Sequence, residues 1–194
     1  MFGDRKHHKT AVLIHGLCDE RVVWDRQVAA FKDSMNVITY DIRGFGKSPV
    51  GNANGTVEQM ADDLAQIVSA ADVGPVWLVG FSMGGVIAQR FALDFPDMVE
   101  GLVLVASSCV VGKPGVEYFT SRTKMVEEGG LETFRQIATE DGRGCIGNGD
   151  EKLVEAYQNV RINAVSDPEG YLNAARAMLR LSEKPIIQEL GNID

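Results

Sequence analysis

The sequence contains no apolar run near the roughly 18 residues that a membrane-spanning helix needs. Its first residues are polar and basic, without the apolar stretch of a signal peptide after them. It has no block of Lys or Arg, and its formal net charge is −8, so neither nucleic acid nor an anionic membrane is an expected partner. Cysteine is scarce and odd in number, without metal-ligand spacing, which predicts reduced thiols, no metal site and a cytoplasmic location.

Length and composition fit one globular domain. The chain has 194 residues, of which 45% are hydrophobic and 24% charged, enough apolar residues to bury a sizeable core. Neither an internal repeat nor a low-complexity segment interrupts it. The sequence therefore predicts a soluble domain of ordinary size.

The first half of the sequence alternates between two patterns. Short runs of Val, Ile and Leu without polar alternation predict parallel strands buried on both faces, at 11–14, 37–40, 76–79 and 102–105. Helical patterns lie between them at 24–32, 56–70 and 86–95. This alternation predicts an α/β fold with right-handed crossovers.

The pattern changes after Ala106. Helices are expected at 118–128, 131–138, 151–164 and 170–181, with glycine-rich or Asp-Pro breaks between them and no buried strand. We expect residues 1–108 to form a sheet-based core, 109–184 a helical lid over it, and 185–194 a linker toward a further core segment.

The strongest chemical signal is the turn from Gly80 to Gly85, which follows a predicted strand and opens a predicted helix. G-x-S-x-G in that context is typical of a strained serine nucleophile, here Ser82, whose hydroxyl stands above the sheet. Gly80 and Gly84 omit Cβ atoms that would clash across the turn, and Gly85 lets the helix pack closely on the strand. The alternative is a glycine-rich turn with an incidental serine, which the strand–turn–helix context disfavours.

The end of the first predicted strand carries a second signal, His15-Gly16-Leu17. Gly16 lets the chain swing so that the Leu17 N–H faces the nucleophile. There it would form an oxyanion hole with the N–H of Met83. His15 is expected to hold this loop by hydrogen bonding and to take no part in proton transfer.

A third segment, Asp41 to Ser48, ends like a phosphate-binding loop. Such a loop needs a glycine where this sequence has Asp41, and Pro49 opposes the helix that should follow. No nucleotide, and no other cofactor, is expected.

Together these segments resemble the α/β-hydrolase superfamily, and within it the small serine esterases. The motifs H-G-x, D-x-R-G-x-G-x-S and G-x-S-M-G-G occur between Thr10 and Ser107 in that family's order. Segments 127–131 and 166–171 are similar to parts of 3-oxoadipate enol-lactonases and their relatives. The resemblance implies a parallel sheet flanked by helices, a helical lid, and hydrolysis of small carboxylic esters or lactones through an acyl-enzyme on Ser82.

The resemblance also implies a catalytic acid and a histidine after Ser82, and the sequence offers neither. Its three histidines, His7, His8 and His15, all precede Ser82. The chain is then a piece of a longer hydrolase (the favoured interpretation), or is completed by another chain, or is a binding module or receptor without a triad. An incomplete copy of the fold has open sheet edges, which predicts association with a second copy or a complementing chain.

Aromatic residues near these motifs are candidates for the substrate pocket. Trp24, Phe81 and Tyr118 are expected to line an apolar pocket under the lid, although core packing explains each of them equally well. The expected partner is a small-molecule ester or lactone.

Overall fold

The computed structural model describes residues 7–147 and 149–193, which are built on a parallel sheet of four strands. The strands are β1 (Thr10–Ile14), β2 (Asn36–Thr39), β3 (Val76–Phe81) and β4 (Val99–Val105). Their order is β2-β1-β3-β4, and Val12 of β1 lies in register with Ile38 and Leu78. All four predicted strands are confirmed, with β3 and β4 longer than expected.

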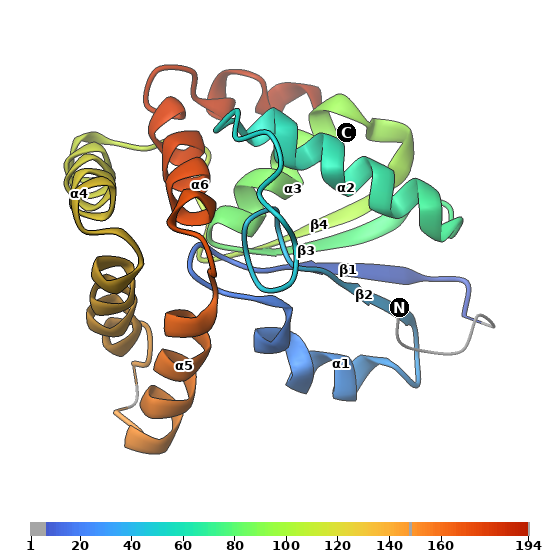
Figure 1. Cartoon of the computed structure of the whole chain (residues 1–194). Helices are drawn as coiled ribbons and strands as arrows, with labels where there is room; N and C mark the ends of the chain where they lie inside the picture. Colours follow the sequence, from blue (N-terminus) through green and yellow to red (C-terminus); the bar gives the residue numbers. More distant parts are fainter. Residues whose placement is uncertain (1–6, 148, 194) are drawn as a thin grey trace.

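Helices cover both faces of the sheet (Figure 1). On one face lie α2 (Val57–Ala71) and α3 (Met83–Asp94); on the other lies α1 (Asp25–Phe31), preceded by the short helix η1 (Arg21–Trp24). Successive side chains of a strand point to opposite faces. In β1 this places one set of residues in the larger core beneath α2 and α3, and the alternate set in a smaller core with α1.

Local signals in the sequence set the ends of the helices. Thr56 caps α2, because its hydroxyl accepts a hydrogen bond from the Gln59 N–H at 3.2 Å. After α3 the chain passes through Pro96, the first residue of the short helix η2 (Pro96–Met98), and enters β4. Pro96 cannot continue the ladder of α3, so the helix stops there.

A helical segment, which we call the α4–α6 segment, lies beyond the carboxyl ends of the strands (Figure 1). It comprises α4 (Lys113–Gly144), α5 (Glu151–Asn163) and α6 (Pro168–Arg180). The helices expected at 118–128 and 131–138 are the two parts of α4, which breaks at Gly130 with φ of 62° and ψ of −148°. None of the helices in the described part of the chain has the length and apolar character needed to cross a bilayer.

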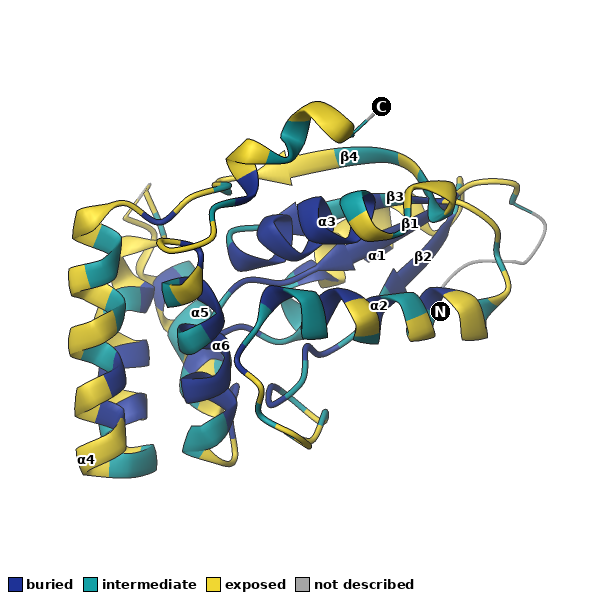
Figure 2. Cartoon of the chain, turned by 90° about the horizontal axis from the view of Figure 1, so that it is seen from above, coloured by how far each residue is buried: buried dark blue, intermediate teal, exposed yellow. Residues whose placement is uncertain are grey.

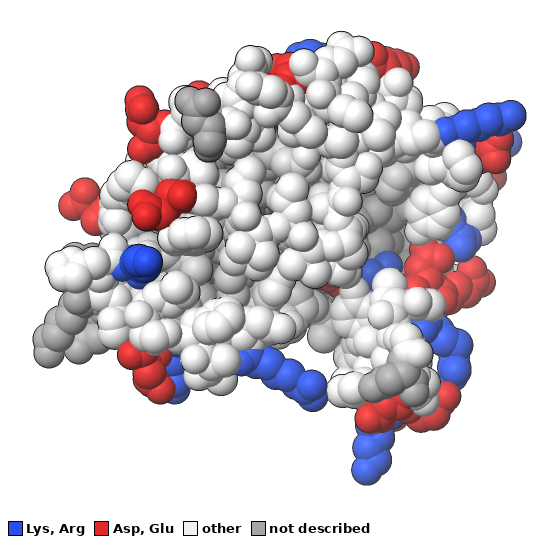
Figure 3. All heavy atoms as spheres, turned by 180° about the vertical axis from the view of Figure 1, so that it is seen from behind, with Lys and Arg blue, Asp and Glu red and all other residues white. Residues whose placement is uncertain are grey.

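The strand β4 differs from its prediction. We expected burial on both faces, but Val103, Leu104 and Val105 are 42%, 47% and 42% exposed. The reason is position: β4 is an edge strand, and its outer side faces solvent (Figure 2). The view from behind shows a broad area with few Asp, Glu, Lys or Arg side chains (Figure 3).

The C-terminal residues return across the core beside β4 and α3. They form two short helices, η3 (Ile186–Gln188) and η4 (Leu190–Asn192). Ile193 lines a hollow with Val99 and Leu102 of β4. The first half of β4 therefore lies near the C-terminal residues, while Val103 to Val105 remain exposed to solvent.

Candidate active site

Ser82 occupies a strained turn between β3 and α3. Its φ of 52° and ψ of −118° lie in a region that residues other than glycine rarely adopt. The Ser82 N–H donates to the Val105 carbonyl at 2.9 Å, and the Ser82 carbonyl accepts from the Ser107 hydroxyl at 2.9 Å. Hydrogen bonds on both sides of the residue thus hold the strained backbone.

Glycines make this turn sterically allowed. A Cβ atom on Gly80 would lie 2.4 Å from the Gly85 Cα, and one on Gly84 would lie 2.3 Å from the Ile14 carbonyl oxygen. A Cβ on Gly85 would lie 2.3 Å from Ser107 Oγ, so Gly85 also makes room for the serine that holds Ser82. Close packing of α3 on the sheet, and on the loop after β1, depends on these three positions.

His15 joins the loop after β1 to the loop after β2. Its Nδ1–H donates to the Gly16 carbonyl at 2.8 Å, and its Nε2 accepts from the Ile42 N–H at 2.9 Å. The ring is fully buried, and burial lowers the pKa of His15 to about 4, against the raising effects of the Gly16 hydrogen bond and of Asp41. His15 is therefore neutral near pH 7, and both of its ring nitrogens are occupied.

The residues expected to supply the oxyanion donors lie at the same end of the sheet. Gly16 to Asp19 form a turn, in which the Asp19 N–H donates to the Gly16 carbonyl at 3.3 Å. Within residues 7–147 and 149–193, neither the Leu17 N–H nor the Met83 N–H donates to an acceptor. The approach of Gly84 to Ile14 brings the start of α3 against this turn. Two unused donors thus lie at this end of the sheet, and one of them belongs to the residue that follows Ser82.

A hollow of about 280 Å³ is lined by Phe81, which precedes Ser82 in the chain, and by Val105, whose carbonyl accepts from the Ser82 N–H. The side chains that line it come from the core and from the α4–α6 segment: Asp19, Val23, Trp24, Gln27, Phe81, Val105, Cys145, Ile146 and Tyr157. Most of its apolar lining comes from Trp24, Phe81, Val105 and Ile146. The structure therefore brings Trp24 and Phe81 together.

Tyr118 lies outside this hollow. It is 38% exposed on α4, and its hydroxyl donates to Asp141. Sequence reasoning missed Asp19 and Tyr157, which line the hollow. Asp19 could have been suspected because it follows the H-G-L-C segment, whereas nothing local marks Tyr157.

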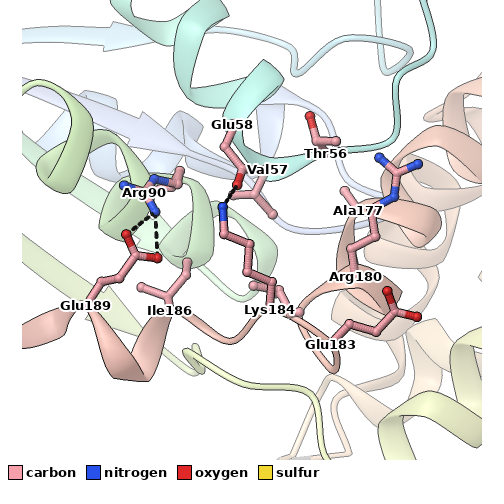
Figure 4. Close-up of a pocket in the computed structure, with 11 residues that line it drawn as sticks. Thr56, Val57, Glu58, Arg90, Ala177, Arg180, Glu183, Lys184, Ile186 and Glu189 are labelled. Atoms are coloured by element: carbon pink, nitrogen blue, oxygen red, sulfur yellow. Dashed lines mark hydrogen bonds and ion pairs between the residues drawn. The ribbon is translucent and has the colours of Figure 1, made fainter.

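A second hollow, of about 350 Å³, lies between the start of α2, the end of α6 and the C-terminal residues (Figure 4). Four of its charged groups form two ion pairs with one another. Arg90 bonds Glu189 at 3.0 Å, and Lys184 bonds Glu58 at 3.2 Å. These pairs fasten the C-terminal residues to α3 and α2.

Among the described residues, no side chain is placed to act as a general base for Ser82. No histidine or carboxylate hydrogen-bonds to the Ser82 hydroxyl in that part of the chain, and His15 uses both ring nitrogens elsewhere. Serine without a base is a weak nucleophile. The described residues thus hold a serine turn and two N–H donors but no base.

Comparisons with known proteins identify the family of the chain. Residues 10–154 match the family described as alpha/beta hydrolase fold. The chain is 26% identical over 173 residues to 3-oxoadipate enol-lactonase 2 of Acinetobacter baylyi, covering 87% of this chain and 62% of that protein. It is 31% identical over 127 residues to the putative carbamate hydrolase RutD of Agrobacterium fabrum, covering 64% of this chain and 48% of that protein.

Solved structures extend the similarity over the whole chain. A thermophilic esterase from Thermogutta terrifontis superposes with a TM-score of 0.83 at 26% identity, covering 100% of this chain and 70% of the esterase. The enol-lactonase from Burkholderia xenovorans superposes with a TM-score of 0.79 at 23% identity, covering 93% of this chain and 69% of that chain, which shows a shared fold. The chain belongs to the alpha/beta hydrolase fold family, and it spans 62% of the length of the Acinetobacter baylyi relative.

Proposed function

We propose that this chain supplies the nucleophile and the oxyanion hole of a serine hydrolase acting on small carboxylic esters or lactones. The observation that carries the proposal is the strained Ser82 at the same end of the sheet as the unused N–H groups of Leu17 and Met83. Family membership and relatives named as an enol-lactonase and an esterase support the same chemistry.

In this mechanism the Ser82 hydroxyl attacks the substrate carbonyl while a base accepts its proton. The Leu17 and Met83 N–H groups donate to the developing oxyanion. As the tetrahedral intermediate collapses, the base returns its proton to the leaving oxygen, which departs as the alcohol and leaves an acyl-enzyme. Water then releases the acid and restores Ser82. His15, Gly16 and the glycines around Ser82 position these groups, and the base comes from outside the described residues.

The size and lining of the hollow at Phe81 and Val105 support a small substrate. Its volume of about 280 Å³ and its apolar walls suit a compact acyl or alkyl group. Because Cys145, Ile146 and Tyr157 close one side, the α4–α6 segment acts as a lid in this proposal.

A fluorophosphonate probe tests the proposal directly. We expect slow labelling of Ser82, found by peptide mass spectrometry, which added imidazole accelerates because it replaces the absent base. The Ser82→Ala variant should show no labelling at this position, and Ser69→Ala, at an exposed serine of α2, is the matched control that leaves the Ser82 turn intact. Labelling that is absent with and without imidazole in folded protein contradicts the nucleophile assignment.

A second candidate function is a binding module or receptor built on the same fold. The absence of a base in contact with Ser82, among the described residues, favours it. A receptor would bind small esters or lactones without labelling of Ser82 and without releasing acid. Isothermal titration calorimetry of the ligands that are tried as substrates separates the two functions. Binding without labelling of Ser82 and without acid release indicates a receptor, whereas labelling or acid release indicates the hydrolase.

We also propose that the open edge of β4 pairs with a second copy or with a complementing chain. Three consecutive exposed apolar residues on a strand with one unpaired edge are an aggregation-prone feature. Leu104→Lys should therefore lower self-association in sedimentation velocity, while Phe31→Lys, at a 41% exposed apolar residue of α1, should leave it unchanged. Equal sedimentation of wild type and Leu104→Lys would exclude the edge as the contact.

The cysteines support a cytoplasmic location in this proposal. Cys18, Cys109 and Cys145 are all free thiols in the structure. Disulfides are rare in reducing compartments, so unpaired cysteines fit such a location.

A further inference from the structure

The turn at Gly16–Asp19 has an unfavourable residue at its third position. Cys18 has φ of +62°, while Leu17 does not have a positive φ. With the Asp19 N–H bonded to the Gly16 carbonyl, this combination defines a type II turn, in which the third residue is normally glycine. A flip of the Leu17–Cys18 peptide to a type I turn would relieve Cys18.

The two peptide groups on either side of Leu17 are each held by a side chain. The Gly16 carbonyl accepts from His15 Nδ1 at 2.8 Å, and the Leu17 carbonyl accepts from Arg161 Nη1 at 3.3 Å. In a trans peptide the C=O and N–H point in opposite directions, so the bond to Gly16 directs the Leu17 N–H away from His15. The flip of the next peptide would carry the Leu17 carbonyl away from Arg161.

Arg161 reaches this turn from α5. Its side chain is only 7% exposed, and its Nη1 lies 3.6 Å from Asp19 Oδ1, whose side chain is 1% exposed. The same guanidinium donates to the Ala138 carbonyl and to the Tyr157 hydroxyl, both at 3.3 Å. One buried cation therefore joins α4, α5 and the turn.

We propose that Arg161 is a positioning residue that couples docking of α5 to the conformation of the Gly16–Asp19 turn. While α5 is docked, Arg161 holds the Leu17 carbonyl and keeps Cys18 at positive φ. When α5 moves away, the turn loses this bond and relaxes toward type I. Only the catalytic consequence, the placing of the Leu17 N–H as an oxyanion donor, rests on the proposed function. The coupling between α5 and the turn does not depend on it.

Backbone NMR of an Arg161→Met variant tests the coupling. We expect the strong intraresidue amide-to-Hα NOE of Cys18, which marks positive φ, to be lost, and the Leu17, Cys18 and Asp19 amide resonances to shift. Arg143→Met is the matched control, because the Arg143 side chain is 63% exposed and its guanidinium bonds Glu151 of α5 at 2.9 Å, away from the turn. Unmoved resonances and a retained NOE in Arg161→Met overturn the proposal.

Two further variants make the result decisive. Adding Cys18→Gly to Arg161→Met should return the Leu17 and Asp19 resonances toward wild type, because glycine favours the type II turn by itself. If Arg161→Met does not fold, Arg161→Lys keeps a positive charge near Asp19 but cannot reach the Ala138 and Leu17 carbonyls together. It should shift the same resonances, and resonances that stay in place overturn the proposal.

Labelling of Ser82 separates this inference from the proposed function. Where imidazole supports labelling of wild type, Arg161→Met should slow it by about tenfold or more, since a misplaced oxyanion donor costs at least that much. An unchanged labelling rate overturns the positioning role. A wild-type chain that does not label at all contradicts the proposed function, while the NMR result still decides the coupling.

Discussion

Gly84→Ala should lower the free energy of unfolding by about 3 kcal/mol, the upper range for forcing an atom into a packed core. The added Cβ would lie 2.3 Å from the Ile14 carbonyl oxygen and 2.6 Å from that of His15, and neither backbone atom can move without displacing the end of β1. Because Gly84 lies in α3, helix propensity alone would give the opposite sign. Urea unfolding, followed by circular dichroism, measures the difference.

Gly144→Ala is the control for this prediction. Gly144 is also in a helix, at the end of α4, and a Cβ there would meet nothing within 4 Å. It should therefore leave stability unchanged or raise it by up to about 1 kcal/mol. Similar effects of the two substitutions would show that the close approach of α3 to β1 is not what requires glycine.

Acidification from about pH 6.5 to pH 4 should remove about 3 kcal/mol of stability through His15 alone. Burial holds the pKa of His15 at about 4 in the folded chain, below the ordinary histidine value of 6.5. Above pH 6.5 the ring is neutral in both states. Between pH 6.5 and pH 4, His15 binds a proton in the unfolded chain but stays neutral in the folded chain. The free energy of unfolding therefore falls across this range, and it levels off once His15 is protonated in both states.

The measurement is the free energy of unfolding against pH for wild type and for His15→Gln. The variant should be less stable near pH 7, because the bond between His15 and the Gly16 carbonyl is lost, but its stability should depend less on pH between 6.5 and 4. His8→Gln, at an exposed histidine, should keep the wild-type slope. Parallel profiles for wild type and His15→Gln would contradict the buried, neutral state of His15.

The strand–turn–helix around Ser82 was predictable because its constraints are local. G-x-S-x-G places its glycines within two residues of Ser82, and strand and helix patterns on either side define the turn. The same holds for Thr56, which caps the helix that it precedes. Parallel strands and covering helices likewise follow from short apolar runs, which indicate burial without reference to distant residues.

Exposure of β4 could not be predicted from its residues. Val103, Leu104 and Val105 have the composition of a central strand, and only their place at the edge of the sheet leaves them open. The prediction that Tyr118 lines the substrate pocket failed for a similar reason, because a residue far along the chain decides where its side chain lies. Its hydroxyl bonds Asp141, 23 positions later, within α4 itself.

The sequence by itself determined the family, the order of strands and helices, and Ser82 with its flanking glycines, because each depends on neighbours a few residues apart. Only the tertiary structure decided which groups surround the turn after β1. Arg161 holds the Leu17 carbonyl across 144 positions, and Tyr157 meets Trp24 in one hollow. Such contacts depend on how α5 packs against α4 and η1, and no local pattern of residues encodes this packing.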